Sequence, residues 1–288
     1  MSLSIQNIRR GLAGWLIVSM GLALGSTANA QELYERAGWV ADIPSGAHSV
    51  QAKITIVNDH MLQVENFTYD GTAPLVYFYL GESDSYGDFL DGQQVLPELD
   101  RAFDDESLLI RLPQGETLDG YNAISVWCAA FDINFGSASF VAPAEPYART
   151  GWVADIPPGQ HDSEGQATII TDRIIEVDHF TYDGTAPQVY FYLGEIDDYD
   201  SFLNGLEVPP LLDRAYNDES LVLLLPEGTN LDGYGAISVW CAAFDINFTS
   251  ASFEDPNELP VPATSEWGLA ILTLLTCTAG TVILRRQM

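Results

Sequence analysis

Positive charge is scarce in this chain. Lys and Arg together number 11 against 41 Asp and Glu, which gives a formal net charge of −30 at pH 7. Four of the 11 bases, Arg9, Arg10, Arg285 and Arg286, lie in the two end segments, so seven remain between them. So acidic a surface repels phosphate backbones, which excludes nucleic acid as a partner. The acidic surplus indicates solubility or adaptation to a salty medium, with cation binding as the functional alternative.

Cysteine and histidine are also scarce, at three and four residues. No Cys-x-x-Cys-His sequence occurs, which excludes ordinary c-type haem attachment, and no Cys/His cluster has the spacing of a zinc site. With so few histidines, no Ser/His/Asp arrangement can be picked out. The sequence therefore predicts no metal site and no classical enzyme active site. It leaves a redox role and the identity of any cofactor open.

The first 30 residues have the layout of a secretory signal peptide. Arg9 and Arg10 supply its positive region, and residues 11–24 form an apolar stretch too short for an ordinary membrane span. The Ala-Asn-Ala of residues 28–30 matches a cleavage site with small residues. We expect an exported protein whose mature chain begins near Gln31.

The C-terminal end carries a second hydrophobic segment, residues 267–284, followed by an Arg pair that would hold this end in the cytoplasm. Residues 261–268 resemble the motif of IPTL-CTERM and PEP-CTERM sorting tails, with Val-Pro-Ala-Thr for the typical Ile-Pro-Thr-Leu and a matching Ser-Glu-Trp-Gly. The resemblance implies an envelope sorting enzyme as partner and at least transient membrane attachment through the tail. It also implies a membrane-anchored, periplasmic or cell-surface location in a Gram-negative-type bacterium. A plain single-span anchor is the alternative.

The central part of the chain is an internal duplication. The sequence Gly-Trp-Val-Ala-Asp-Ile-Pro at residues 38–44 recurs at 151–157, and the same offset of 113 takes Cys128 to Cys241 without a gap. Each unit is long enough for a core of its own. The predicted organisation is a signal peptide (1–30), a first β domain (31–142), a linker (143–148), a second β domain (149–255), a Pro-containing spacer with the sorting motif (256–266) and a hydrophobic tail (267–288).

Each unit has the pattern of an all-β domain, because no long helical periodicity occurs outside the two chain ends. A tight turn is expected at Asp70-Gly71, and a short helix over residues 97–103. Frequent turn signals between short strands favour a β-sandwich in each unit, flanked by a signal helix and a C-terminal hydrophobic helix. In the first unit we expect strands at 52–57, 61–67, 76–80, 108–112, 123–128, 131–135 and 138–141.

The densest motif spans residues 124–136 and recurs at 237–249. Ile124, Val126 and Cys128 lie on one face of a strand. Phe131, Ile133 and Phe135 also share a face, but they are out of phase with Cys128. Since a strand has a period of two, a bulge or a turn must break the register at Ala129-Ala130.

Several segments together resemble the DM-thirteen family, the electron-transfer module that accompanies DOMON domains in Skeletor- and Knickkopf-type proteins. They are residues 66–74, 76–81 and 127–140 in the first unit, and 179–184 and 239–241 in the second. In that family the cysteine of a Trp-Cys motif is proposed to be a redox thiol or the attachment point of a prosthetic group. The resemblance implies this role for Cys128 and Cys241, beside Trp127 and Trp240, although Thr249 replaces a glycine of the first unit.

One cysteine in each unit cannot close a disulfide within that unit. We expect Cys128 and Cys241 to be unpaired and partly shielded, with a bridge between them as the rival, and small buried hydrophobes as the structural alternative. In so acidic a protein, a reactive thiol needs a nearby cation to lower its pKa from about 8.5. The candidates present in both units are His48 and His161, Arg36 and Arg149, and Arg101 and Arg214.

Two functional classes follow. The first is an extracytoplasmic electron-transfer or thiol-redox module with an unidentified redox partner. The second is a non-catalytic acidic module that binds a surface ligand, matrix or calcium. Calcium would bind at acidic loops, which are more often simply solvated, and a sugar would bind on aromatic faces, which are more often core and cross-strand packing. The residues concerned are Asp84, Asp88, Asp91, Asp197, Asp198 and Asp200 for calcium, and Trp39, Tyr69, Tyr77 and Tyr79 for sugar.

Overall fold

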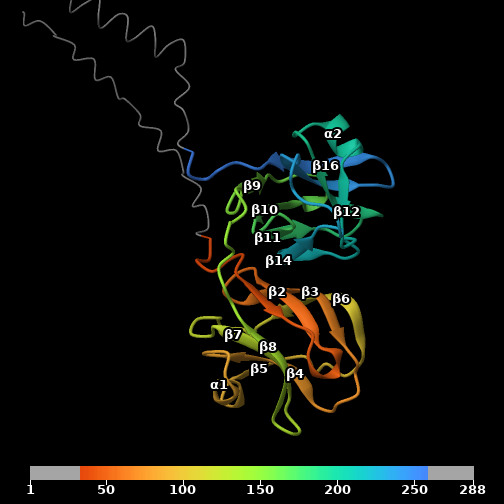
Figure 1. Ribbon diagram of the computed structural model, residues 1–288. Helices are drawn as coiled ribbons and strands as arrows, with labels where there is room; N and C mark the ends of the chain where they lie inside the picture. The colour runs from red at the N-terminus through yellow and green to blue at the C-terminus, as the bar shows by residue number, and fades with distance from the viewer. Residues whose placement is uncertain (1–32, 259–288) are drawn as a thin grey trace, which may run out of the picture. The chain divides into compact units, whose positions relative to one another are not determined.

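The computed structural model describes residues 33–258, which contain two repeats of one all-β fold (Figure 1). The first repeat consists of β1 (Val40–Ile43), β2 (Gln51–Ile56), β3 (Met61–Tyr69), β4 (Val76–Gly81), α1 (Tyr86–Leu90), β5 (Gln93–Val95), β6 (Phe103–Arg111), β7 (Ala123–Cys128) and β8 (Ile133–Ser139). The second consists of β9 (Val153–Ile156), β10 (Glu164–Ile169), β11 (Ile174–Tyr182), β12 (Val189–Gly194), α2 (Tyr199–Leu203), β13 (Leu206–Val208), β14 (Tyr216–Leu224), β15 (Ala236–Cys241) and β16 (Ile246–Ser252).

Each repeat is a sandwich of two four-stranded antiparallel sheets. The orders are β1-β2-β3-β6 and β5-β4-β7-β8 in the first repeat, and β9-β10-β11-β14 and β13-β12-β15-β16 in the second. A single core lies between the two sheets of the first repeat, because it draws Ile54 and Val64 from one sheet and Phe78 and Val126 from the other. The all-β class and the strands expected at 52–57, 61–67, 76–80 and 123–128 are confirmed, and the strand expected at 108–112 is the end of the longer β6.

The helix expected over residues 97–103 was wrong. That segment has no helix, and β6 begins at its last residue, Phe103. The short helix lies earlier, at α1, where Ser85 accepts a hydrogen bond from the backbone of Asp88 as a helix N-cap. In α2 the cap is Asp198, which accepts from the backbone of Ser201 at 2.7 Å. The acidic loops thus contain the N-termini of short helices, which negative charge stabilises.

The two strands expected at 131–135 and 138–141 are one strand, β8, and Phe131 precedes it in a tight turn. The predicted break in register is a turn over residues 129–132. The pairing of β7 with β8 also contains a bulge, because Val126 pairs with Gly136 but Trp127 pairs with Asn134. The turn removes Phe131 from the sheet, so its side chain follows neither face.

The repeats contact each other through a small apolar cluster within one compact unit of the described residues. Val57 and Met61 of the first repeat pack with Ile170 and Ile174 of the second, which occupy the equivalent positions 113 residues further on. All four side chains are almost completely buried. Each repeat therefore contributes the same part of its surface to the contact, as in a local two-fold arrangement.

The predicted signal helix and C-terminal hydrophobic helix fall in residues 1–32 and 259–288, outside the described residues. Within residues 33–258, the helices are too short and too polar to span a membrane.

Candidate functional site

The two candidate cysteines lie at the C-terminal ends of equivalent strands in the two repeats. Cys128 is the last residue of β7 and Cys241 the last of β15, and their exposed fractions are 0% and 1%. The Cys128 thiol donates to the Pro74 carbonyl oxygen at 3.2 Å, and the Cys241 thiol donates to the Pro187 carbonyl oxygen at the same distance. Both cysteines are free, so no bridge joins them.

The tryptophan next to each cysteine faces the other way, because successive strand residues point to opposite faces of a sheet. Cys128 belongs to the core between the sheets, whereas Trp127 packs on the outer face with Phe89 of α1. The Trp127 ring centroid lies 6.0 Å from that of Tyr79 and 5.3 Å from that of Tyr86. Trp240 has equivalent neighbours in the second repeat. The tryptophans therefore support the sheet from outside and do not line the thiol.

A buried tyrosine lies near each thiol instead. The Tyr69 hydroxyl donates to the Ala73 carbonyl oxygen at 3.0 Å and accepts from the Ala73 amide at 3.1 Å. Burial raises the pKa of Tyr69, and the charge of Asp70 raises it further. The Tyr69 hydroxyl and the Cys128 thiol donate to the carbonyl oxygens of two consecutive residues, Ala73 and Pro74. Tyr182 has the same bonds to Ala186, and its pKa is raised by burial and by Cys241 among other groups.

Aromatic rings continue from this tyrosine to the surface. The Tyr69 ring stacks on Phe135 with centroids 6.4 Å apart, and the Phe135 ring lies 4.3 Å from His48. In the second repeat the corresponding distances are 6.4 Å from Tyr182 to Phe248 and 4.6 Å from Phe248 to His161. About one third of the His48 side chain is exposed, so this series of rings leads from the core to solvent.

His48 is held by a small polar network at the surface. Its Nδ1 lies 3.1 Å from the Asp70 carboxylate and 3.0 Å from the Thr72 hydroxyl. Burial works against ionisation of Asp70, but hydrogen bonds from Thr72 and His48 prevail and lower its pKa. His161, Asp183 and Thr185 repeat the arrangement.

The cations suggested for thiol activation have other partners. Arg101 forms two hydrogen bonds with Glu106 and lies over the Phe103 ring, and Arg214 does the same with Glu219 and Tyr216. Arg36 donates to the carbonyl oxygen of Leu118, and Arg149 to that of Leu231. Among the residues that the structure describes, the bonded partner of each thiol is a backbone carbonyl and not a cation.

A prosthetic group on the cysteines does not fit this geometry. Each sulfur is enclosed in a core cluster and already donates to a carbonyl, so an attached group would have to displace core side chains. We therefore assign no chemistry to such a group.

The calcium and sugar alternatives gain no support from the side chains. Within residues 33–258 no group of three or more His, Cys, Asp or Glu side chains is placed to hold a metal ion. Asp88 accepts from the Ser83 hydroxyl, and Asp84 accepts from Ser137 at 2.6 Å. The aromatic residues do not form one face, because Tyr69 is buried between the sheets while Tyr79 packs on the outer face against Trp127, in agreement with the packing alternative.

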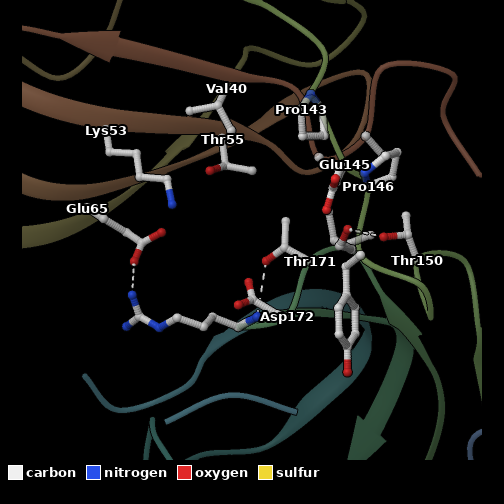
Figure 2. Close-up of a pocket in the computed structure, with 15 residues that line it drawn as sticks. Val40, Lys53, Thr55, Glu65, Pro143, Glu145, Pro146, Thr150, Thr171 and Asp172 are labelled. Atoms are coloured by element: carbon white, nitrogen blue, oxygen red, sulfur yellow. Dashed lines mark hydrogen bonds and ion pairs between the residues drawn. The ribbon is translucent and has the colours of Figure 1, made fainter. Parts of the chain in front are cut away.

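A cavity of about 290 Å³ lies where the repeats meet, and its walls carry both signs of charge (Figure 2). Glu65, whose side chain is only 5% exposed, accepts from the Arg173 guanidinium at 2.7 Å. Lys53, Glu145 and Asp172 also line it. Walls that carry both signs of charge favour no single class of ligand, so this cavity is part of the contact between the repeats.

Sequence reasoning missed Tyr69 and Tyr182 as neighbours of the thiols, together with Phe135, Phe248 and the acceptor carbonyls of Pro74 and Pro187. The available signal was the Thr-Tyr-Asp-Gly-Thr-Ala-Pro segment, which ends β3 and leads into β4. It contains the Tyr69 phenol, the Asp70 carboxylate that binds His48, and the Pro74 carbonyl that accepts from the thiol.

The fold and these sites define a tandem all-β protein with one enclosed thiol in each sandwich. The profile of the family described as "Electron transfer DM13" matches residues 42–140 and 157–253, and the chain belongs to that family, with two tandem copies. The chain is 29% identical over 243 residues to "Protein Skeletor, isoforms B/C" of Drosophila melanogaster, a match that covers 80% of this chain and 30% of that protein. The match to isoforms D/E has the same identity and covers 16% of that protein. The chain thus spans less than a third of the length of these curated relatives.

Proposed function

We propose that each repeat is a one-electron transfer module in which Cys128 or Cys241 is the redox group. The observation that carries the proposal is an enclosed thiol in the same core as a buried tyrosine, whose ring leads through Phe135 or Phe248 to a surface histidine. Family membership supports electron transfer as the class of function.

The enclosure of the thiol supports one-electron rather than two-electron chemistry. A disulfide needs a second thiol in reach, and both cysteines of the described residues are free in separate cores. Stepwise oxidation to sulfenic acid needs an accessible thiolate, and these thiols are 0% and 1% exposed. Oxidation therefore removes one electron and the thiol proton from a cysteine, leaving a thiyl radical. The electron passes to a one-electron acceptor protein and the proton to solvent, and a one-electron donor reverses the step.

The aromatic rings have a defined part in this proposal. Tyr69 lies in the same core as the thiol, and its phenol, whose pKa is raised above the ordinary value, is protonated at neutral pH. Phe135 and His48 extend the series of rings to the surface, and Asp70 fixes the orientation of His48. Tyr69 is thus the intermediate position between the enclosed sulfur and an outside acceptor.

Protein-film voltammetry on the full chain tests this assignment. In a Cys277→Ser background, which removes the tail cysteine, we expect one electron for each repeat and two for each chain. Cys128→Ser and Cys241→Ser should each remove one of the two, and the double variant both. A chain with no faradaic signal, or a signal that survives the double variant, would reject the cysteines as the redox groups.

A second candidate is a non-catalytic acidic surface module, favoured by the absence of a bonded cation at either thiol among the described residues. In that case the cysteines are small core hydrophobes. Maleimide labelling across pH, with and without reductant, separates the two candidates together with the voltammetry. Thiols that label only on denaturation, in an electrochemically silent protein, would favour this second function.

We also propose that the protein is exported to the envelope of a Gram-negative-type bacterium and is held there, at least transiently, by its C-terminal segment. The signal-like residues 1–30 and the tail residues 267–288 support this proposal. Intact-mass measurement of envelope-extracted protein should show a start near Gln31 and loss or exchange of the tail within residues 261–267. A mass that includes everything through Met288 would leave the plain membrane anchor.

A further inference from the structure

Exposed apolar residues lie around the strand end that carries each enclosed thiol. Phe131, in the turn after β7, is 66% exposed, and its amide donates to the Cys128 carbonyl oxygen at 3.4 Å. Ile133 pairs with Cys128 across β7 and β8, and 48% of it is exposed. Leu75, 45% exposed, follows the carbonyl that accepts the thiol proton, and its own carbonyl accepts from the Ala129 amide at 2.8 Å. We call Leu75, Phe131 and Ile133 the apolar tip of the first repeat.

Directly paired residues of neighbouring strands have side chains on the same face, so Ile133 lies beside the Cys128 side chain. Ile133 is half exposed while Cys128 is fully buried, so this isoleucine brings exposed apolar surface beside the residue that carries the thiol. In the second repeat Ile246 pairs with Cys241 in the same way, and Phe244 is again 66% exposed.

The second repeat keeps this surface apolar by a different residue. Position 75 becomes Gln188, which would make the surface more polar, but Glu98 becomes Leu211, which is 40% exposed. The two positions are neighbours, since the Leu75 amide donates to the Glu98 carboxylate at 3.1 Å. Between the two repeats the leucine and the polar residue have thus exchanged positions. The exposed leucine of the second repeat is therefore not simply retained from a common ancestral sequence. The apolar tip of the second repeat is Leu211, Phe244 and Ile246.

The backbone holds these side chains outward. Leu75 has φ 50° and Asp132, between Phe131 and Ile133, has φ 55°, in a left-handed region that is uncommon for leucine. Gln188 and Asp245 have φ 52° and 53°. A strained turn that presents exposed apolar groups is typical of a recognition surface rather than of a core.

The apolar tip of the first repeat has acidic neighbours. Asp132 and Asp70 are exposed, and Glu98 lies between Leu75 and Tyr77. The nearby Arg101 is neutralised by Glu106. Across the chain, the net charge of −30 produces a negative field that attracts a positive partner and speeds its encounter.

We propose that the apolar tip of each repeat is the docking surface for a basic electron-carrier protein, which places its redox cofactor against the residues that cover the thiol. This inference rests on the proposed function. An apolar centre within an acidic rim suits a small, transient and salt-sensitive contact with a cationic protein.

The test measures binding of the full chain, in detergent, to a basic c-type cytochrome, with an acidic blue copper protein of similar size as the second probe. Phe131→Ser with Phe244→Ser should weaken binding of the cytochrome at least tenfold. The matched control is Leu90→Ser with Leu203→Ser, which removes apolar residues of 46% and 42% exposure from α1 and α2 and should change the dissociation constant less than twofold. The acidic probe should bind at least tenfold more weakly than the basic one.

Several outcomes would overturn the inference. An unchanged dissociation constant in the phenylalanine variant would mean that the cytochrome binds only through general charge attraction. Equal binding of the two probes would remove the argument from charge. Sedimentation showing that the parent chain self-associates through these phenylalanines would assign the tips to a second copy of the chain.

The cysteine variants separate this inference from the proposed function. Cys128→Ser with Cys241→Ser should bind the cytochrome with an unchanged dissociation constant, because the thiols lie beneath the surface. A voltammetric signal that is independent of the cysteines would reject the proposed function alone. An intact cysteine signal combined with binding that is indifferent to the phenylalanines would reject the docking surface alone.

Discussion

Glu176 offers a prediction that depends on pH. It lies on β11, is only 5% exposed, and accepts a hydrogen bond from the Asn58 side chain of the other repeat. The pKa of Glu176 is raised from 4.5 to about 8, chiefly by burial and also by the charges of Asp178 and Asp59, while Asn58 and Arg111 act in the opposite direction. The carboxyl group is therefore neutral in the folded protein below about pH 8.

The sign of the effect follows from linkage. A group whose pKa is higher in the folded than in the unfolded chain contributes stability that is fully present below about pH 4.5 and is lost as pH rises through about 8. Each pKa unit corresponds to about 1.36 kcal/mol, so the loss approaches about 5 kcal/mol as an upper limit. Since the surroundings can relax around the ionised carboxylate, we expect about 2 to 4 kcal/mol.

The perturbation is Glu176→Gln, which keeps the size and the capacity to accept from Asn58 but cannot ionise. The free energy of unfolding, measured by urea denaturation at pH 5, 7 and 9, should be nearly the same as that of the parent at pH 5. At pH 9 it should exceed the parent value by about 2 to 4 kcal/mol. Glu116→Gln, at an exposed position, is the matched control and should follow the parent throughout. If the difference between Glu176→Gln and the parent is the same at pH 5 and pH 9, the buried acid does not titrate in this range and the reasoning fails.

Four further substitutions have expected effects on stability. Gly71→Ala should destabilise by well over 1 kcal/mol in thermal unfolding, because Gly71 has φ +69° and an added Cβ would lie 2.4 Å from the Ala102 amide. Gly115→Ala, at φ +88° with open space, should cost only about 1 kcal/mol. Arg173→Ala leaves the Glu65 carboxylate buried without its partner and should cost about 3 to 5 kcal/mol in urea denaturation, so a loss below 1 kcal/mol would contradict a buried ion pair. Trp127→Ala should cost about 3 to 5 kcal/mol without changing the voltammetric signal, whereas a shifted potential would mean that the ring does reach the thiol.

The sequence predicted the parts of the fold that depend on local pattern. The duplication, the all-β class and most central strands follow from period-two alternation between turn residues. The phase conflict between Cys128 and Phe131 correctly indicated a break in the strand, because register is a local property. The helix was misplaced because the acidic loop has the composition of a solvated turn, and the cap that starts α1 is a single serine, Ser85.

The surroundings of the thiols could not be predicted in the same way. Adjacency in sequence suggested Trp127 as the neighbour of Cys128, but the pleat sends the two side chains to opposite faces. Tyr69 enters the core that holds the thiol from the facing sheet, and this arrangement depends on how two sheets pack, which no local pattern encodes. His48 was selected for its charge, yet its geometry assigns it to Asp70 and Phe135.

The last prediction concerns the independence of the two repeats. We expect residues 36–142 and 149–255, expressed separately, to give two soluble β-rich proteins, since each repeat has both sheets and its own core. Separation exposes the inter-repeat cluster around Met61 and Ile174, so each fragment should be less stable than the full chain.

The same cut should change the pH response of the second repeat. Without Asn58 and Asp59 of the first repeat, Glu176 becomes accessible to water, which stabilises its ionised form. Fragment 149–255 should therefore lose little stability between pH 5 and pH 9, and Glu176→Gln should have almost no effect in it. Circular dichroism during urea denaturation measures both quantities. An unfolded fragment beside a folded full chain would mean that the two repeats form one cooperative unit. A folded fragment that keeps the full pH dependence would place the origin of the raised pKa within the second repeat itself, in the neighbouring charge of Asp178.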